Sequence, residues 1–208
     1  MLSLKFPFPL DKEIIIVDDG STDKTREILK QYSNKKKVSL HFKKKNSGKG
    51  AAIREGLKFV TGDYVIIQDA DMEYSIDDYA RLLEPLISGR ASVVYGSRFL
   101  GKIQKMKLPH RMFNIFIRSL VNILYGTKLT DEATAYKVFR TGLLKELNLK
   151  SQRFAVCPEM TAKVLNRGIT IHEVPIHYRG RNSLEGKKIR WYDGFEAIYT
   201  LLKYRFCK

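Results

Sequence analysis

Several residue types are scarce in this sequence of 208 residues, and each scarcity excludes a class of protein. Only two cysteines occur, Cys157 and Cys207, so the chain has no disulfide framework and suits a reducing compartment. No segment approaches the roughly 18 consecutive apolar residues that a membrane-spanning helix needs. The first ten residues lead directly into a charged segment, which argues against a secretory signal. A disulfide-rich mini-protein, a collagen and a polytopic membrane protein are therefore excluded.

Acidic residues are also few, with 22 Asp and Glu against 38 Lys and Arg, which gives a formal net charge of +16. Hydrophobic residues make up 44% of the chain, enough to bury a core. The length predicts a single domain over residues 1–208, with residues 1–12 as an atypical N-terminus. Such a charge suits an anionic membrane surface or a nucleic acid. No nucleic acid is expected, because the aromatic residues cluster in apolar helical segments instead of alternating with the lysines.

Short β-branched segments alternate with amphipathic helical ones through the first half of the chain. Strands are expected at 13–17, 38–42, 63–68 and 91–96, and helices from Ser21 or Thr22 to Ser33, at 50–60 and at 76–87. Lysine triplets at 35–37 and 43–45 flank the second strand and indicate solvated strand ends or attraction to a membrane. The alternation predicts an α/β fold, Rossmann-like, with a mainly parallel sheet flanked by helices.

Two helices in the second half have unusually wide apolar faces. They are expected at 109–126 and 191–206. Such a face packs in a core, lies on a membrane or binds a partner. Core packing is the ordinary explanation of either helix alone, but two of them in a strongly basic chain also favour a membrane surface.

Asp69 and Asp71 are the most informative pair of residues. They lie two positions apart at the end of a buried strand, so their carboxylates point to the same side, where ligands bind in open α/β sheets. The two charges repel unless a cation lies between them. Oxygen ligands suit Mg²⁺ or Mn²⁺, which could bridge them to a diphosphate. The alternative is an acidic loop that faces water.

Two further segments follow predicted strands. Asp18 and Asp19 precede a turn at Gly20, where a carboxylate can accept hydrogen bonds from a nucleobase or ribose. The alternative is ordinary helix capping by Ser21 or Asp23. The glycine-rich segment 46–50 contains Lys49 and resembles a phosphate loop, but it lacks the spacing of a P-loop NTPase.

The ordered series of these motifs resembles the family-two glycosyltransferases of GT-A fold, over residues 13 to 206. The series is similar to that of the dolichyl-phosphate mannosyltransferase branch. The series consists of segments 17–23, 46–56, 68–74, 95–99, 130–131 with 136–139, 158–163, 173–176, 178–179 and 185–188.

The resemblance implies roles for individual residues. Asp69 and Asp71 match the family's metal-binding Asp-x-Asp, with Glu73 near the metal, and Asp18 or Asp19 faces the nucleoside. The residues that hold the phosphates are expected among the basic side chains of Arg98, Arg111, Arg118, Arg181, Lys49, Lys137 and Lys187. Asp71, Arg98 and Arg181 are the expected catalytic residues. Each basic residue could instead lie on a solvated face.

The resemblance also implies a reaction. A sugar moves from a nucleotide-sugar of the GDP-mannose or UDP-glucose type to a polyprenyl or dolichyl phosphate, with inversion and with Mg²⁺ or Mn²⁺. A phosphate acceptor is already an anion, so a general base is dispensable. One alternative is transfer to a hydroxyl group, for which the sequence shows no base. Lys187 to Trp191 lacks the glutamine of processive synthases, which makes polysaccharide synthesis less expected.

Two departures from the family pattern matter. The family's first strand, with a Pro-x-Tyr-Asn-Glu-like string, is missing before Asp18, which suggests a second alternative: a truncated, inactive binding or assembly subunit. Cys157 also replaces a residue that is often acidic. The expected location is the cytoplasmic face of a membrane, with peripheral attachment through helix 111–125 and the C-terminal helix, or through a membrane-anchored partner or second copy.

Overall fold

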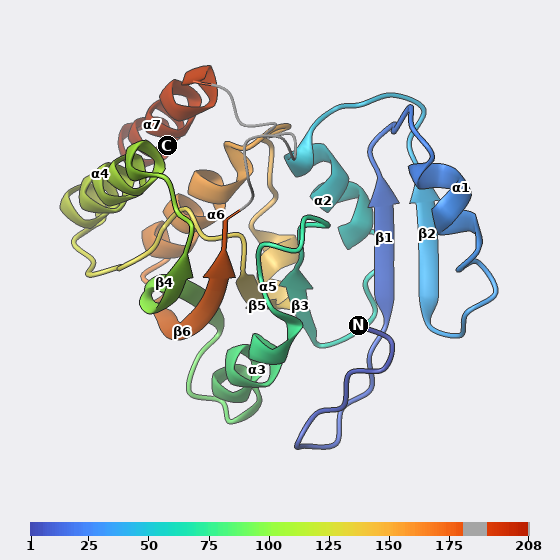
Figure 1. Cartoon of the computed structure of the whole chain (residues 1–208). Helices are drawn as coiled ribbons and strands as arrows, with labels where there is room; N and C mark the ends of the chain where they lie inside the picture. Colours follow the sequence, from blue (N-terminus) through green and yellow to red (C-terminus); the bar gives the residue numbers. More distant parts are fainter. Residues whose placement is uncertain (181–190, 208) are drawn as a thin grey trace.

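The computed structural model describes residues 1–180 and 191–207, which form a layered α/β structure (Figure 1). In chain order the elements are β1 (Ile14–Asp18), α1 (Thr25–Lys30), β2 (Val38–Phe42), α2 (Lys49–Leu57), β3 (Tyr64–Ile67), the 3₁₀ turn η1 (Ile76–Asp78), α3 (Tyr79–Ile87), β4 (Val93–Gln104), α4 (Leu108–Tyr125), β5 (Lys137–Arg140), α5 (Thr141–Glu146), α6 (Val156–Asn166), β6 (Ile171–Arg179) and α7 (Trp191–Phe206). The alternation of strands and helices that was predicted for the first half of the chain is confirmed, whereas β5, α5, α6 and β6 were not predicted.

The described strands form two sheets. β1 and β2 pair in parallel, and the other four follow the order β3-β5-β4-β6. β5 is antiparallel to both β3 and β4, whereas β4 and β6 are parallel. The sheet is therefore mixed, and the expectation of a mainly parallel sheet was too simple. The antiparallel pairings arise because the chain returns after α4 to insert β5 between β3 and β4.

The two sheets present unpaired edges to each other. Within the described chain β1 pairs only with β2, and β3 only with β5. Figure 1 shows β1 and β3 running the same way, side by side, with no described strand between them. The Glu13 carboxylate links the two regions, because it accepts hydrogen bonds from the backbone N–H groups of Thr61 at 2.8 Å and Gly62 at 2.9 Å.

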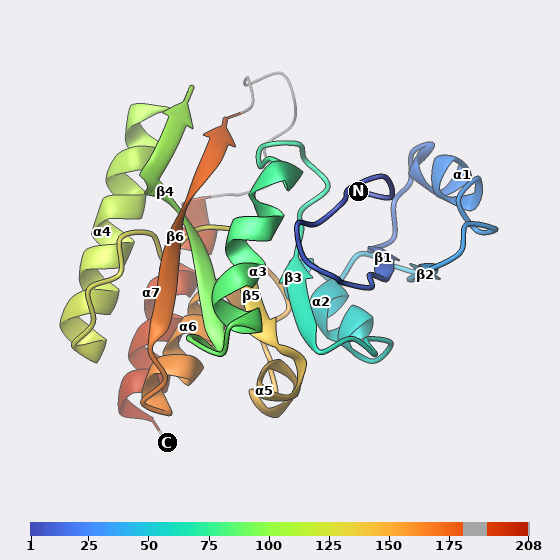
Figure 2. The same cartoon turned by 90° about the horizontal axis from the view of Figure 1, so that it is seen from below.

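Apolar side chains cover both faces of the four-stranded sheet. One core cluster joins this sheet to α4, α6 and α7, and the other joins it to α3 (Figure 2). The atypical N-terminal segment packs against the second cluster through Leu4, Phe6, Phe8 and Leu10. These residues alternate with exposed ones, which is the period of an extended chain. No buried member of either cluster comes from β1, β2 or α1.

Element boundaries differ from the sequence predictions at specific places. α1 is confined to Thr25–Lys30, and β4 continues well beyond Gly96 to Gln104. Its pairing with β6 shifts register between Ser97 and Lys102. A Cβ atom at Gly101 would overlap the backbone of Ile176 in β6, so this close approach of the two strands requires glycine.

Both predicted amphipathic helices are present, as α4 and α7. Proline occupies the first turn of α4, and Gly126, with φ of 65°, ends the helix in the left-handed conformation. Among the helices that the structure describes, none has the length and apolar character needed to cross a bilayer.

Candidate active site

The acidic segment after β3 contains three carboxylates. Asp69, Asp71 and Glu73 are half-buried and alternate with the exposed Ala70 and Met72. Met72 has φ of 57° and is 92% exposed, an unfavourable combination for a bulky apolar residue. Such strain in a short loop is typical of functional sites. The predicted common orientation of the carboxylates therefore agrees with the burial pattern.

Lys49 approaches this segment from the first turn of α2. Its ammonium group lies 2.7 Å from a carboxylate oxygen of Asp69. Burial alone would lower the pKa of Lys49, but its interactions with Cys157 and Asp69 outweigh this effect, so the pKa is raised. Lys49 therefore stays charged and neutralises one of the two paired aspartates. The glycine-rich segment therefore meets the acidic segment.

The carboxylate donor set fits a hard divalent cation in its chemistry, but the three groups are not already gathered around one point. Asp71 accepts a hydrogen bond from the Glu73 backbone N–H at 3.1 Å. Across the described part of the chain, no three His, Cys, Asp or Glu side chains are arranged to hold a metal ion. Asp69 and Asp71 are the pair that would hold Mg²⁺ or Mn²⁺, once Lys49 shares or releases Asp69.

Asp18 and Asp19 both hold loops together at the end of β1. Asp18 is buried and accepts hydrogen bonds from the Ser21 backbone N–H at 3.2 Å and from the Arg26 guanidinium at 2.7 Å. Burial raises the pKa of Asp18, but hydrogen bonds from Ser21 and Arg26 outweigh this and lower it overall. Asp18 therefore stabilises the turn after β1, and Asp23 accepts the Thr25 backbone N–H at 3.0 Å at the start of α1.

Asp19 joins this turn to the glycine-rich segment. Its carboxylate accepts backbone N–H groups from Ser47 at 3.0 Å and Gly48 at 2.6 Å, and pairs with Lys43 at 2.6 Å. Gly20, with φ of 76°, allows the approach, since a Cβ there would lie 2.5 Å from the Asn46 nitrogen. The two predicted nucleotide-binding segments are thereby brought together and fixed in one orientation.

Arg98 forms a buried ion pair and does not face solvent. Two of its guanidinium nitrogens each lie 2.7 Å from an oxygen of Asp131, and Arg98 is only 6% exposed. Its guanidinium also lies 5.3 Å from the centre of the Tyr178 ring. The expectation that Arg98 directly holds a phosphate finds no support in these contacts. The sequence motif was significant for a different reason, since this pair connects β4 to the segment before β5.

Tyr178 extends this network to the acidic segment. Its hydroxyl donates to Glu73 at 3.3 Å, and the Arg179 backbone N–H donates to the Glu73 carbonyl at 2.9 Å. Burial raises the pKa of Tyr178, with the negative charge of Glu73 adding to the effect. Asp131 and Tyr178 were not among the predicted site residues, although both lie inside the motif segments that carried the family resemblance.

Lys137 is also buried. Its ammonium donates to the Glu132 carbonyl at 2.6 Å and lies 3.5 Å from the centre of the Tyr95 ring. Burial lowers its pKa, and Glu132 and Cys157 offset this in part. With 1% of its surface exposed, Lys137 is not placed to meet a phosphate from solvent. The phosphate-binding prediction for Lys137 is therefore replaced by a structural role.

Two predicted arginines lie on α4, beside a surface pocket. The pocket has a volume of about 450 Å³ and is lined by Phe99, Gly101, Ile103, Lys105, Met106 and Arg111. Arg118 lies beside the pocket, because its guanidinium is 5.2 Å from the centre of the Phe99 ring. It also donates a hydrogen bond to the Thr130 carbonyl at 3.3 Å. The lining combines the apolar Phe99, Ile103 and Met106 with the cationic Lys105 and Arg111, and this combination suits a phosphate that carries a hydrocarbon chain.

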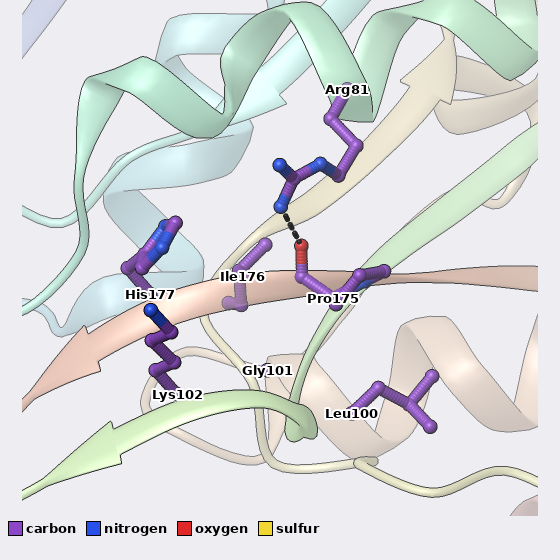
Figure 3. Close-up of a pocket in the computed structure, with 7 residues that line it drawn as sticks. All are labelled: Arg81, Leu100, Gly101, Lys102, Pro175, Ile176 and His177. Atoms are coloured by element: carbon purple, nitrogen blue, oxygen red, sulfur yellow. Dashed lines mark hydrogen bonds between the residues drawn. The ribbon is translucent and has the colours of Figure 1, made fainter.

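A second pocket, of about 320 Å³, lies where α3 meets β4 and β6 (Figure 3). Arg81 reaches across it to donate to the Pro175 carbonyl at 2.9 Å, and His177 contacts Asp78 at 2.9 Å. This pocket contains no residue that the sequence predicted for the site. Arg181 and Lys187, by contrast, lie outside the described residues.

Solved structures of GT-A fold resemble this chain over most of its length. Glucosyl-3-phosphoglycerate synthase from Mycobacterium tuberculosis, solved in complex with Mn²⁺, uridine diphosphate and phosphoglyceric acid, aligns with a TM-score of 0.70 and 18% identity. The alignment covers 94% of this chain and 68% of that one. The class is therefore the GT-A fold, and the predicted fold class is confirmed.

Residues 3–147 match the family described as Glycosyl transferase family 2, and the chain belongs to that family. A dolichyl-phosphate beta-glucosyltransferase of Trichomonas vaginalis is 30% identical over 185 residues, which cover 86% of this chain and 56% of the relative. A UDP-N-acetylglucosamine–dolichyl-phosphate N-acetylglucosaminyltransferase of Methanococcus voltae is 29% identical, over 94% of this chain and 86% of the relative.

A low-salt glycan biosynthesis hexosyltransferase of Haloferax volcanii is 26% identical, over 90% of this chain and 45% of the relative. The chain thus spans about half the length of two of these three relatives. The predicted resemblance to family-two enzymes is confirmed.

Proposed function

We propose that this protein transfers a sugar from a nucleotide-sugar to a polyprenyl or dolichyl phosphate. The observation that carries the proposal is the 450 Å³ pocket beside α4, which combines the apolar Phe99, Ile103 and Met106 with Lys105 and Arg111. Phe99 directly follows Arg98, and from Arg98 a continuous series of contacts leads through Tyr178 to Glu73 in the acidic segment. Two relatives are named as transferases to dolichyl phosphate, which agrees with a lipid-phosphate acceptor.

The donor would bind where the glycine-rich and acidic segments meet. Asp69 and Asp71 would hold Mg²⁺ or Mn²⁺, which supplies positive charge to the departing diphosphate. Lys49 would move its charge from Asp69 toward the diphosphate, and Asp19 keeps its loop in position through Ser47 and Gly48. Arg181 and Lys187 remain proposed phosphate ligands. For Asp18 we propose support of the nucleoside loop instead of direct contact.

The acceptor phosphate would enter from the α4 side, with Arg111 and Arg118 as its cationic partners. These arginines would bring an anionic acceptor close to an anionic donor and offset their repulsion. A phosphate oxygen attacks without a general base, and attack opposite the leaving group inverts the anomeric centre. Transfer to a hydroxyl group would need a general base, whereas the proposed transfer to a phosphate does not.

The identity of the donor and the location of the protein are also proposals. A UDP-sugar such as UDP-glucose is preferred over GDP-mannose, because two relatives are named for glucosyl and N-acetylglucosaminyl transfer. The proposed location is the cytoplasmic face of a membrane, with peripheral attachment, or attachment through a membrane-anchored partner or a second copy.

A second candidate function is that of a nucleotide-binding or assembly subunit without catalytic activity. The observation that favours it is the pair of unpaired edges on β1 and β3, beside the segments that would hold the donor. Such edges favour association with another chain. This candidate predicts nucleotide binding without transfer.

The experiment that tests the proposal incubates the purified chain in detergent with UDP-glucose, UDP-N-acetylglucosamine or GDP-mannose, Mn²⁺ and a short polyprenyl phosphate. Glycolipid product from one donor, lost with a chelator and with Asp71→Asn, supports the reaction. The matched control is Asp63→Asn, a nearby exposed aspartate that is expected to keep full activity. A parallel reaction with the free polyprenol tests the hydroxyl alternative. Nucleotide binding without product from any donor would favour the subunit function.

A further inference from the structure

Two neighbouring helices, α4 and α7, present apolar side chains to solvent on one side of the molecule. They form its outermost layer there (Figure 1). We define the α4–α7 face by the exposed residues Leu108, Met112, Phe116, Ile123, Tyr192, Phe195, Tyr199, Leu202 and Phe206. Several are more exposed than core packing allows, with Ile123 at 81% and Phe206 at 71%. Core packing, the ordinary explanation of such helices, accounts for only part of their apolar surface.

The exposed residues of α7 recur with helical spacing. Tyr192, Phe195, Tyr199, Leu202 and Phe206 are separated by three or four residues, so they form one continuous stripe. The opposite side of α7 packs inward, where Leu201 is fully buried in the core cluster. The helix thus has one apolar side for the core and a second one for solvent.

α4 extends this stripe. Every residue from 107 to 113 is exposed, so the first turns of the helix project from the body of the protein. The two helices are in contact, because a Cβ at Gly194 would lie 3.0 Å from the Phe113 ring and the Tyr125 hydroxyl donates to the Leu201 carbonyl at 2.7 Å. Their apolar side chains therefore belong to one surface.

The charge around α4 has a single sign, whereas α7 also carries Asp193, which is buried, and Glu196. Residues 101–128 contain no Asp or Glu, and their basic residues are Lys102, Lys105, Lys107, Arg111, Arg118 and Lys128. Lys203 and Arg205 are exposed near the end of α7. Apolar side chains flanked by lysine and arginine are the pattern of helices that lie in the plane of an anionic membrane surface.

We propose that the α4–α7 face docks onto an anionic lipid bilayer, with both helices lying in its interface. A folded protein partner would cover one side of α4, whereas the residues of its first turns, 107 to 113, are all exposed although Phe113 contacts α7, and such turns suit immersion among headgroups. This surface adds a binding partner to the proposed function. It does not depend on the transfer reaction, because docking needs neither donor nor acceptor.

Sedimentation of the full chain with sonicated vesicles tests the proposal. Vesicles of phosphatidylcholine with 30% phosphatidylglycerol should bind the protein, and those of phosphatidylcholine alone should bind it more weakly. Raising the salt to 1 M should weaken binding to the anionic vesicles, because it screens the basic residues. Neither donor nor acceptor is added, so failure here leaves the transfer assay in detergent as a separate result.

Charged substitutions on the face provide the decisive comparison. Ile123→Glu and Phe195→Glu should each weaken vesicle binding about tenfold or more, since each removes a large apolar contact and adds repulsion. The matched control is Ile28→Glu on α1, which replaces an apolar residue that is 54% exposed but distant from the face. Circular dichroism melting of all three variants checks that the fold is intact.

Three outcomes would overturn the proposal. The first is absence of binding by the unsubstituted chain to anionic vesicles. The second is equal binding by the face variants and the Ile28→Glu control. The third is a dimer in light scattering that dissociates on Phe195→Glu, which would assign the face to a second copy of the chain.

Discussion

The buried pair of Arg98 and Asp131 allows a structural role to be separated from phosphate binding. Asp131 is 1% exposed, and its carboxylate accepts the Arg98 backbone N–H at 2.9 Å as well as both guanidinium contacts. Asp131→Asn removes the charge that balances a buried guanidinium. Breaking a buried pair from one side costs about 3–5 kcal/mol of unfolding free energy. In a domain of this size that corresponds to a melting temperature lower by about 6–20 °C.

Calorimetry and urea unfolding of Asp131→Asn and Arg98→Gln measure this cost. The matched control is Arg90→Gln, which breaks the ion pair with Glu84, whose two side chains are 58% and 52% exposed. That change should cost no more than about 1 kcal/mol. If Asp131→Asn and Arg90→Gln were equally stable, while Arg98→Gln lost only acceptor affinity, the argument for a structural pair would be refuted and Arg98 would be a phosphate ligand.

The remaining predictions concern the donor side of the site. Lys49→Gln should strengthen Mn²⁺ binding in the absence of nucleotide by roughly two- to fivefold, because the Lys49 ammonium no longer competes with the metal for Asp69. Electron paramagnetic resonance measures this effect. The same substitution should weaken donor binding. Gly20→Ala should lower the free energy of unfolding by more than about 3 kcal/mol, because a clash with the Asn46 backbone adds to the strain of a positive φ. Gly89→Ala should lower it by only about 1–2 kcal/mol, because Gly89 has φ of 75° but open space around it. Asp18→Asn should destabilise the protein at pH 7 but not in acid. The folded pKa of Asp18 is lowered, so its stabilisation is complete above the unfolded pKa of about 3.9 and is lost as the pH falls through the folded value.

Each of these predictions has a contrary result. Unchanged or weaker Mn²⁺ binding in Lys49→Gln would show that Lys49 does not compete for Asp69. Equal melting temperatures for the two glycine variants would remove the case for a close approach at Gly20. A stability difference between Asp18→Asn and the unsubstituted chain that persists well below pH 3 would assign the effect to packing instead of charge.

The sequence predicted the strands and helices of the first half of the chain and the two apolar helices α4 and α7, but not β5, α5, α6 or β6. Asp69 and Asp71 follow a buried strand, and Lys49 begins a helix, so local patterns alone placed them near a common sheet edge. The antiparallel insertion of β5 was not predictable, because residues 137–140 carry no signal for the strands between which they pair. Strand order depends on how the whole chain returns, which local periodicity does not specify.

The basic residues show the limit of prediction from motifs. Arg98 and Lys137 lie inside motif segments and Arg118 lies in the helix predicted at 109–126, and the sequence made all three candidate phosphate ligands. Only the three-dimensional structure separates the buried Arg98 and Lys137 from Arg118, which lies beside the pocket. Their buried partners, Asp131 and Glu132, lie 33 and 5 residues away in the chain, and no spacing rule connects an arginine to a particular distant carboxylate.

The division of the sheet has a consequence for how the protein responds to its donor. β1, β2 and α1 contribute no buried side chain to either core cluster, so this unit should open at a lower free energy than the rest of the fold. The same unit carries the Asp18 and Asp19 turns. A ligand that binds only the closed form stabilises it by about 2.7 kcal/mol at a concentration of 100 times Kd. Backbone amides of β1 and β2 should therefore exchange rapidly with solvent deuterium until nucleotide is added, whereas those of β4 should be protected throughout. In this domain the ordering of the donor site would be part of donor recognition.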